Sequence, residues 1–481
     1  MAKRYQTVIG LEFHAELKTA TKIFCSCPNT VAATPNSNVC PVCLGLPGVL
    51  PVLNRHAVEL AATAGMALNC EVAPYSKFDR KNYFYPDLPK DFQTTQFPLP
   101  ICKNGYLTIP ADDGGEKKVR INRIHMEEDA GKLVHSGDSL ATSNYSMPDY
   151  NRAAVPLIEI VTEPDISSAA EARAFGELLR LTLAYADVSD VRMEQGSLRC
   201  DVNISLKPWD SDQLGTKVEI KNLNSFRAVF RAIQYEEMRQ ADMLDYGETI
   251  VQETRLWNDA TGETVSMRSK EDSHDYRYFP EPDLPPIVID QAWMDEIRAK
   301  VPELPTARKA RLAALGLSEK ETDQIIASTR LARFFDEMMA EFGDAKTIAN
   351  WLLGDFSRLM GQLDEDAPIP FPAADLSELL TVLKKGEINN NSAKAVLEEM
   401  FVNGGKPADI IKAKGFAQIS DSSALLGIVQ SVIANNPKPV EEFRGGKEKA
   451  FGFLLGAAMR ESKGQGNPAV IRELLMEELK K

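Results

Sequence analysis

The 481-residue chain lacks several familiar nucleotide-binding and catalytic motifs. It contains no Gly-x-x-x-x-Gly-Lys-Ser/Thr phosphate loop and no Gly-x-Ser-x-Gly elbow around a serine nucleophile. Gly464 and Gly466 lack the third glycine of a dinucleotide fingerprint, so a loop is the better interpretation there. If the protein binds a nucleotide, it therefore does so through a less common arrangement.

The chain also lacks a hydrophobic run long enough to cross a bilayer. The longest uncharged apolar run, Val39–Leu53, contains three prolines and is shorter than the ~20 residues that a membrane-spanning helix needs. No hydrophobic signal-peptide core follows the basic residues near the N-terminus. With 44% hydrophobic and 26% charged residues, the composition is that of a globular protein. We expect a cytoplasmic protein of about two to four domains, without a membrane segment.

An excess of positive charge is missing as well. The formal net charge is −14, so the overall field does not indicate a nucleic-acid partner. Residues 401–481, however, carry 12 Lys and Arg against 9 Asp and Glu. This makes the C-terminal end the better candidate for phosphate contacts, although a solvated surface is the simpler interpretation of charge alone.

The order of the predicted elements favours an α+β fold. Ser168 can cap a helix that reaches about Leu183, and a second helix runs from about Ser225 to Leu244. Between them, residues 199–206 and 216–222 are typical of the two strands of a hairpin. Because strands and helices do not alternate regularly, we predict a mainly antiparallel sheet rather than a doubly wound fold.

Two breaks divide the chain into three predicted domains. The proline-dense stretch Phe279–Pro286 ends the first region, and amphipathic helices follow it. A second break lies around Asn403–Pro407. We predict an N-terminal domain over residues 1–292, an all-α helical domain over 293–405 and a small all-α tail domain over 406–481.

Four of the seven cysteines lie close together in the sequence. They are Cys25, Cys27, Cys40 and Cys43. Two close pairs of thiolates separated by a loop can form a tetrahedron around Zn²⁺, and a closed four-sulfur site has a structural role. The alternative is a group without metal or with a redox role. A disulfide framework is disfavoured because the chain is long and its number of cysteines is odd.

Polar side chains alternate along several predicted strands. With a period of two, each strand places one set of polar residues on one face: Glu12 and His14; Arg199 and Asp201; Lys217, Glu219 and Lys221. Glu127 and Glu128 follow in a third acidic segment. Carboxylates that lie close together repel one another unless a cation binds between them. Oxygen ligands with one imidazole suit Mg²⁺ or Mn²⁺. Lys and Arg nearby suit contacts with phosphate oxygens. A metal site with basic side chains beside it is typical of enzymes that transfer phosphoryl groups.

A solvated sheet face with alternating charges is the competing interpretation of this pattern, because the sequence does not show that these strands meet. Two further basic segments also have two interpretations. Lys77, Arg80 and Lys81 alternate with Tyr83 and Tyr85, which suits a single-stranded nucleic-acid end or an aromatic loop under the sheet. The glycine-rich segments around Arg444, Lys447, Lys449 and Lys463 suit phosphates or a solvated helical surface.

Several long segments, in the same order along the whole chain, resemble the B subunit of the aspartyl/glutamyl-tRNA amidotransferases (GatB). They are Val8–His14, Leu44–Pro51, Lys77–Asp87, His125–Lys132, Pro156–Val161, Gly196–Ser205, Lys221–Phe226 and Asp275–Asp283. The resemblance implies a catalytic cradle in residues 1–292 and a YqeY-like tRNA-binding tail in 406–481. It also implies a heterotrimer with a GatA-type glutaminase and a GatC-type subunit.

In that family, ATP and Mg²⁺ serve to phosphorylate the side-chain carboxylate of Glu-tRNA(Gln) or Asp-tRNA(Asn). Ammonia from the glutaminase subunit then displaces the phosphate and yields Gln-tRNA(Gln) or Asn-tRNA(Asn). Such a protein is a ligase that uses ATP as a substrate. The sequence also leaves two rival functions open, which are a tRNA-docking scaffold without chemistry and a free-standing metal-dependent hydrolase.

The resemblance implies a role for each candidate residue. Catalytic residues or Mg²⁺ ligands would be Glu12, His14, Glu127, Glu128, Asp201 and Glu219. Phosphates of ATP would contact Lys217, Lys221 and Arg199, tRNA would contact the two basic segments, and the four clustered cysteines would hold Zn²⁺. Phe13 and Ala15 stand where the family often has Val, and Phe13 should point to the core. Gln195 stands where Glu is common, so that position is doubtful as a ligand.

Overall fold

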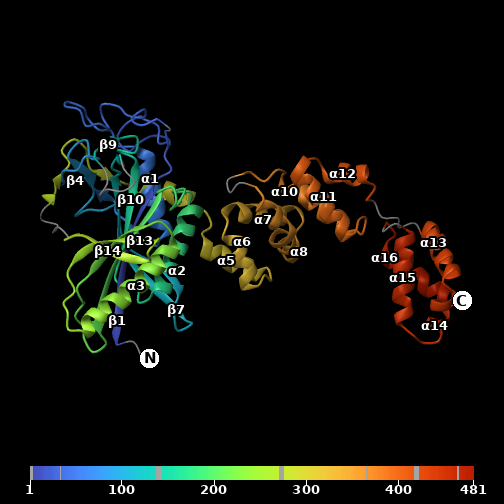
Figure 1. Cartoon of the computed structure of the whole chain (residues 1–481). Helices are drawn as coiled ribbons and strands as arrows, with labels where there is room; N and C mark the ends of the chain where they lie inside the picture. The colour runs from blue at the N-terminus through green and yellow to red at the C-terminus, as the bar shows by residue number, and fades with distance from the viewer. Residues whose placement is uncertain are drawn as a thin grey trace. The chain divides into compact units, whose positions relative to one another are not determined.

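The computed structural model describes residues 4–32, 34–136, 144–269, 276–363, 367–416, 422–462 and 465–480. It divides into two compact units, Met1–Pro305 and Thr306–Lys481. The first contains the strands and the second is helical, which confirms the predicted α+β class (Figure 1). The three-domain division at residues 292 and 405 stays a prediction.

A nine-stranded sheet organises the first unit, in the order β14-β13-β12-β11-β1-β10-β7-β6-β2. Its strands are β1 (Tyr5–Glu16), β2 (Glu71–Val72), β6 (Cys102–Pro110), β7 (Glu116–Glu128), β10 (Pro156–Thr162), β11 (Leu198–Pro208), β12 (Val218–Leu223), β13 (Glu253–Asn258) and β14 (Glu263–Ser269). All neighbours pair antiparallel except β12 and β13, which are parallel. The predicted mainly antiparallel sheet is confirmed.

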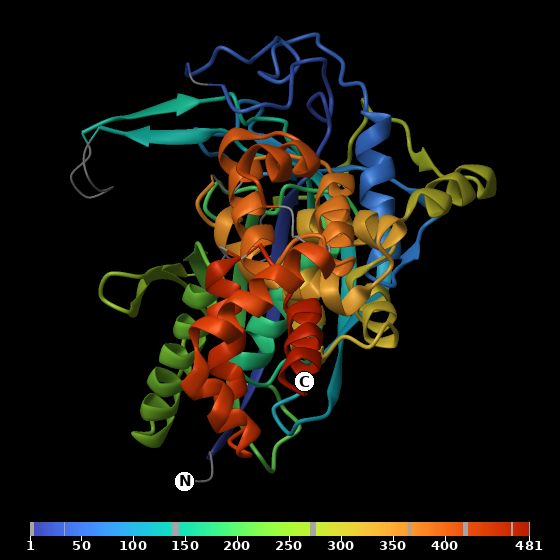
Figure 2. The ribbon, with the colours of Figure 1, turned by 90° about the vertical axis from the view of Figure 1, so that its right-hand side faces the viewer.

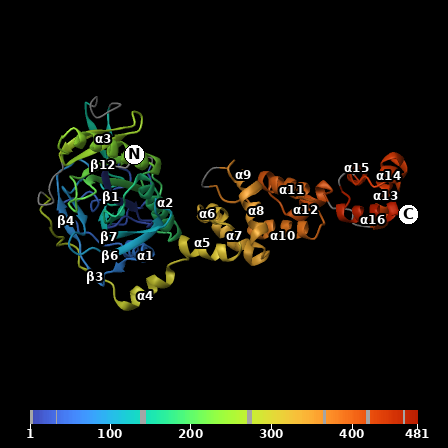
Figure 3. The same cartoon turned by 90° about the horizontal axis from the view of Figure 1, so that it is seen from below.

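One face of this sheet forms the core. Strand β1 directs Ile9, Leu11 and Phe13 to this face, where each is at most 1% exposed. Phe13 contacts Phe175 of α2 with ring centroids 6.1 Å apart, so its predicted core position is confirmed. The covering helices are α1 (Arg55–Ala67), α2 (Ala169–Tyr185) and α3 (Phe226–Asp245). In Figure 3, α1 and α2 lie on one side of the sheet and β4 lies on the other.

The helix starts follow from side-chain caps. Ser168 and Ser225 accept hydrogen bonds from the first turns of α2 and α3 through their hydroxyl oxygens, from the backbone N–H groups of Glu171 and Ala228. These bonds satisfy donors that the helix leaves unpaired. Both predicted helix starts are therefore confirmed.

Small sheets complete the first unit. A three-stranded sheet, in the order β15-β4-β5, consists of β15 (Phe279–Pro280), β4 (Asp79–Asn82) and β5 (Phe92–Thr95). Two two-stranded sheets follow. One pairs β3 (Tyr75–Ser76) with β16 (Ile287–Val288), and the other pairs β8 (Lys132–His135) with β9 (Ser146–Asp149). In Figure 2 the β8–β9 pair extends from the rest of this unit. Helix α4 (Gln291–Lys300) closes the unit.

The helices of the second unit begin with α5. They are α5 (Pro305–Ala314), α6 (Glu319–Ile326), α7 (Thr329–Glu341), α8 (Ala345–Trp351), the π-helical turn η3 (Leu352–Phe356), α9 (Ser357–Met360), α10 (Ala373–Lys384), α11 (Asn390–Asn403), α12 (Pro407–Lys414), α13 (Ser422–Asn435), α14 (Pro437–Arg444), α15 (Lys449–Glu461) and α16 (Pro468–Lys480). Helices α13 to α16 share a core that includes Leu425, Leu454 and Leu475. In the described part of the chain, no helix is long and apolar enough to cross a membrane.

Glu236 of α3 provides a test of how the helix is fixed to the sheet. Its side chain is fully buried and pairs with Arg239 at 2.8 Å and with Arg255 of β13 at 3.1 Å. Glu236→Ala leaves Arg255 without this partner in a largely buried position, and we expect a loss of about 3–5 kcal/mol in the free energy of unfolding. Urea unfolding followed by fluorescence measures it. Met238→Ala, on the exposed side of the same helix, should change the value by less than about 0.5 kcal/mol.

Candidate functional site

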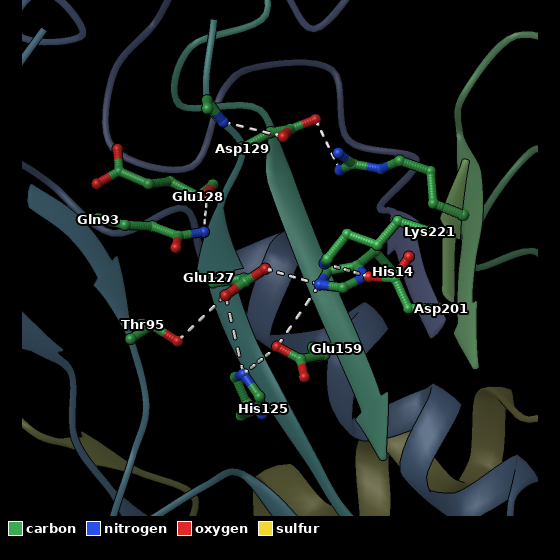
Figure 4. Close-up of polar contacts among 12 residues, drawn as sticks. His14, Gln93, Thr95, His125, Glu127, Glu128, Asp129, Glu159, Asp201 and Lys221 are labelled. Carbon is green, nitrogen blue, oxygen red and sulfur yellow. Dashed lines mark hydrogen bonds and ion pairs between the residues drawn. The ribbon is translucent and has the colours of Figure 1, made fainter. Parts of the chain in front are cut away.

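The face of the sheet opposite the core carries two groups of side chains that could hold a metal ion. The first group contains His14, Glu127 and Glu159, and the second contains Glu12, Asp201 and Glu219. Figure 4 shows the first group and, of the second, Asp201 beside Lys221. In each group, one ligand atom per residue lies within 4.8 Å of the others. The two groups are neighbours because Glu12 and His14 are two residues apart on β1 and therefore face the same side.

Strand register assembles both groups. His14 pairs across β1 and β10 with Glu159, which pairs in turn with His125 of β7. On the other side of β1, Glu12 pairs with Asp201 of β11. The next row places Asn203 of β11 beside Glu219 of β12. Residues directly opposite each other in antiparallel strands have close side chains, so this register alone brings the carboxylates together.

The first group alternates imidazoles and carboxylates. His14 Nε2 lies 3.6 Å from both Glu127 Oε1 and Glu159 Oε2, and His125 Nε2 lies 3.0 Å from Glu159 Oε2. Burial alone would lower the pKa of His125, but the carboxylates of Glu159 and Glu127 raise it to about 9. Burial opposes ionisation of Glu159, yet its two imidazole neighbours hold the pKa of its carboxyl well below the ordinary value.

In the second group, Lys221 of β12 lies close to two of the carboxylates. Lys221 Nζ donates to Asp201 Oδ2 at 2.7 Å and lies 3.5 Å from Glu219 Oε1. Burial disfavours the ammonium form, but Asp201 and Glu219 raise the pKa of Lys221 above its ordinary value. Asn203 Nδ2 donates to Glu12 Oε1 at 2.9 Å. Asn203 Oδ1 is buried and accepts no hydrogen bond from the described residues, so one polar atom beside these carboxylates is left unsatisfied.

A cavity of about 480 Å³ opens beside the second group. Glu12 and Asn203 line it together with Ser205, Thr216, Lys217 and several apolar residues, including Val8 and Val161. Lys217 precedes the first residue of β12 and reaches the cavity from the loop before that strand. The cavity thus combines an apolar wall with carboxylate, hydroxyl, amide and ammonium groups, which suits a polar organic ligand.

The structure does not bring Glu128 or Arg199 into either group. Glu128 follows Glu127 directly, so the strand turns it the other way, where its carboxylate pairs with Lys90 and accepts from Thr94 N at 2.8 Å. Arg199 Nη2 lies 2.9 Å from Asp129 Oδ2. Both predicted residues are therefore engaged with other charged groups near the site.

Glu159 of the first group and its neighbour His125 were not among the predicted site residues. Glu159 is the one charged side chain in the apolar stretch Pro156–Val161. A lone carboxylate in a strand that is buried on both sides could have indicated its role. His125 has the same parity as Glu127, so strand alternation could have identified it as well.

The first basic segment begins at Lys77, just before β4, and ends at Tyr85, just after it. Lys77 pairs with Asp79, and Arg80 pairs with Glu281 at 2.7 Å. The Lys81 ammonium lies 4.7 Å from the ring centre of Tyr276 and 5.7 Å from that of Tyr83. Tyr85 is 48% exposed. The structure therefore places an aromatic and basic surface here, part of whose charge is already paired.

The second basic segment lies between α14 and α15. Arg444, Lys447 and Lys449 are all exposed there. Arg444 Nε donates to the backbone oxygen of Leu479 at 3.2 Å, and Lys447 Nζ lies 3.6 Å from Glu442 Oε1. Lys463, the fourth predicted residue of this set, lies outside the described residues.

The four clustered cysteines form the third candidate site. One sulfur atom from each of Cys25, Cys27, Cys40 and Cys43 lies within 4.8 Å of the others. A hydrogen bond from Cys25 is the main cause that lowers the pKa of the Cys43 thiol, to about 5, and the Lys22 ammonium contributes. Four convergent soft sulfur ligands, one of which ionises easily, fit a tetrahedral Zn²⁺.

Comparisons with known proteins agree along the chain. Residues 7–295 match the GatB/GatE catalytic domain, and residues 333–479 match the GatB domain. The chain is 51% identical over 481 residues to the B subunit of the aspartyl/glutamyl-tRNA(Asn/Gln) amidotransferase of Carboxydothermus hydrogenoformans, and 100% of each chain is covered. It is 52% identical over 477 residues to the protein of the same name from Moorella thermoacetica, which covers 99% of this chain and 100% of that one. The chain therefore belongs to the family of aspartyl/glutamyl-tRNA amidotransferase B subunits.

Proposed function

We propose that this protein is the subunit of a glutamyl-tRNA(Gln)/aspartyl-tRNA(Asn) amidotransferase that activates the misacylated amino acid. In this function, the side-chain carboxylate of tRNA-linked Glu or Asp attacks the γ-phosphorus of ATP and ADP leaves. Ammonia then forms the C–N bond while the C–O bond to phosphate breaks. The observation that carries the proposal is the pair of acidic groups on one sheet face, beside a cavity of about 480 Å³.

The second acidic group fits Mg²⁺ by the chemistry of its donors. Glu12, Asp201 and Glu219 provide carboxylate oxygens, and Asn203 provides an amide oxygen with no partner among the described residues. Magnesium prefers such hard oxygen ligands. Lys221 pairs with Asp201 and lies 3.5 Å from Glu219, so the group contains three carboxylates and one ammonium. A divalent cation would balance that charge and, when bound, would neutralise phosphate oxygens.

The first acidic group offers a further set of donors beside it. His14, Glu127 and Glu159 present one imidazole nitrogen and two carboxylates. Because Glu12 and His14 occupy the same face of β1, a phosphate held at one group would lie next to the other. We therefore keep His14 among the proposed Mg²⁺ ligands. We add Glu159 to the set, and we assign Glu128 and Arg199 to support of the site.

The cavity residues suit the nucleotide. Lys217 of the cavity and Lys221 of the second group would contact its phosphates as point charges, and the apolar wall of the cavity would accommodate its base. The relatives are named as the B subunit of an amidotransferase with several subunits, which supports partner subunits for this chain too. We propose a GatA-type glutaminase that supplies ammonia and a GatC-type subunit, in a cytoplasmic heterotrimer. The two basic segments would contact tRNA, and Zn²⁺ would be structural.

Glu12 provides the most direct test of this chemistry. We expect Glu12→Ala to lower ATP-dependent phosphorylation of the aminoacyl group at least about a hundredfold, because it removes a proposed metal ligand. Binding of the misacylated tRNA should stay within about twofold, since Glu12 lies in the acidic group and not in a basic segment. Single-turnover assays of the assembled enzyme, together with filter binding, measure both.

Glu116→Gln is the matched control, because Glu116 is an exposed carboxylate at the start of β7 in the same sheet. It should leave phosphorylation unchanged. Full phosphorylation by Glu12→Ala would contradict the carboxylate-cluster hypothesis and favour the tRNA-docking scaffold.

The isolated chain should show no glutamine-dependent formation of Gln-tRNA or Asn-tRNA. The physical reason is that the proposed chemistry needs ammonia from a separate active site. Addition of a GatA-type and a GatC-type subunit should restore it, as thin-layer analysis of the labelled aminoacyl adenosine would show. Glutamine-dependent activity from the isolated chain would favour a free-standing enzyme instead.

The tail offers a test of tRNA binding apart from catalysis. Removal of residues 417–481 should weaken tRNA binding at least about tenfold, because it deletes the exposed basic residues between α14 and α15. ATP use by the complex with saturating tRNA should change much less.

The triple variant Arg444→Gln, Lys447→Gln and Lys449→Gln should reduce the salt dependence of tRNA binding. Lys412→Gln in α12 is the control and should not. A larger loss in ATP use than in binding would remove the role assigned to the tail.

A further inference from the structure

Lys22 is a buried lysine that the proposed chemistry does not use. Its side chain is 0% exposed and is among the largest fully buried side chains of the described residues. Lysine is almost never fully buried unless its charge is paired. An isolated ammonium in a protein interior loses its hydration without compensation, which costs several kcal/mol or more. The groups around Lys22 must therefore compensate its charge and satisfy its N–H donors.

The contacts of Lys22 identify these compensating groups. Its Nζ donates to the backbone oxygen of Asn38 at 2.9 Å and to that of Tyr150 at 3.4 Å, and it lies 3.8 Å from Cys43 Sγ. The two carbonyls satisfy N–H donors but carry no net charge. No carboxylate of the described residues lies within 4.0 Å of this ammonium. The cysteine sulfur is therefore the group in contact with it that can become an anion.

We infer that Lys22 is a charge-compensating, positioning residue of the four-cysteine metal site. Four thiolates around one divalent cation leave a net charge of two minus in a half-buried environment. One ammonium in contact with a ligand sulfur halves that charge and replaces the hydration that the sulfur has lost. Groups just outside a metal's own ligands commonly set its affinity in this way. The inference needs a divalent cation at the cysteines and does not depend on the proposed phosphoryl transfer.

The same ammonium also joins the cysteine loop to a second segment. Asn38 lies in the loop between the two cysteine pairs, and Tyr150 follows strand β9. Around Lys22, Asn36 N donates to Asp149 Oδ1 at 3.0 Å, and Asn38 N donates to Asn151 Oδ1 at 2.8 Å. Lys22 thus lies where the metal site and this docked segment meet, and loss of its charge should affect both.

The test measures zinc binding to the full-length chain directly. Lys22→Met keeps the length of the side chain and removes its charge. We expect it to weaken zinc affinity by about tenfold to a hundredfold in competition with a chromophoric chelator at fixed pH. Lys18→Met is the matched control, because Lys18 lies four residues away, is half-exposed and pairs with Asp187. It should leave zinc affinity within about twofold.

Cobalt provides a spectroscopic measurement of the same contact. A nearby cation stabilises the sulfur lone pairs and so raises the energy of thiolate-to-Co²⁺ charge transfer. In Co²⁺-loaded Lys22→Met, this band should move to longer wavelength while the visible bands of tetrahedral Co²⁺ persist. Unchanged charge-transfer bands together with unchanged zinc affinity would overturn the inference. A wild-type chain that binds no zinc would overturn it too, without consequence for the phosphorylation chemistry.

A chain with all four cysteines changed to serine separates charge compensation from simple packing. Without thiolates, the buried ammonium has lost its anion, so Lys22→Met in this chain should leave thermal stability unchanged or raise it. If Lys22 only satisfied two carbonyl groups, Lys22→Met would lower stability equally in both chains, and the inference would be wrong. Failure of Lys22→Met to fold supports the inference if the serine chain with Lys22→Met folds, and contradicts it if that chain also fails.

Discussion

The alternation of side chains along β1 is the constraint on which the rest of the site depends. This 12-residue strand is hydrogen-bonded to β10 on one side and to β11 on the other. Its odd-numbered residues, such as Phe13, fill the core, while Glu12 and His14 face the opposite side. A shift of one residue would bury both polar side chains and expose the apolar ones. The hydrophobic core therefore fixes the register that brings the acidic groups together.

The same arrangement concentrates negative charge at a cost to stability. The charges of Glu127 and Glu159 are offset by two imidazoles, and those of Asp201 and Glu219 by Lys221. Burial opposes the ionisation of Glu127 and Glu159, yet the two imidazoles hold the pKa of both carboxyls below the ordinary value. The second group nevertheless places carboxylate oxygens of Glu12, Asp201 and Glu219 within 4.8 Å of one another. A cation bound at the proposed site would lower the repulsion among them.

Local sequence patterns predicted the helix starts and the alternation within strands. They could not predict which distant strands pair, and this limited the prediction of the site. Ser168 and Ser225 could be identified as caps because a helix start depends on a few neighbouring residues. The shared face of Glu12 and His14 followed from the alternation within one strand. Which strands adjoin β1 depends on packing between segments more than a hundred residues apart, so Glu159 was missed and the two acidic groups were predicted as one. Glu128 was included because its sequence neighbours were acidic, whereas a strand directs adjacent residues to opposite faces.

Two ammonium groups of the first unit, those of Lys221 and Lys22, illustrate how ligand chemistry can keep two metals apart. Lys221 donates to the carboxylate of Asp201 and lies 3.5 Å from that of Glu219, so it contacts hard oxygen donors. Lys22 contacts the sulfur of Cys43, so it contacts a soft donor, which binds a metal as a thiolate. Hard oxygen donors favour Mg²⁺ and soft sulfur donors favour Zn²⁺. Under the proposed function, an exchangeable cation at the oxygen donors would serve catalysis, and a tightly held one at the sulfur donors would serve the fold.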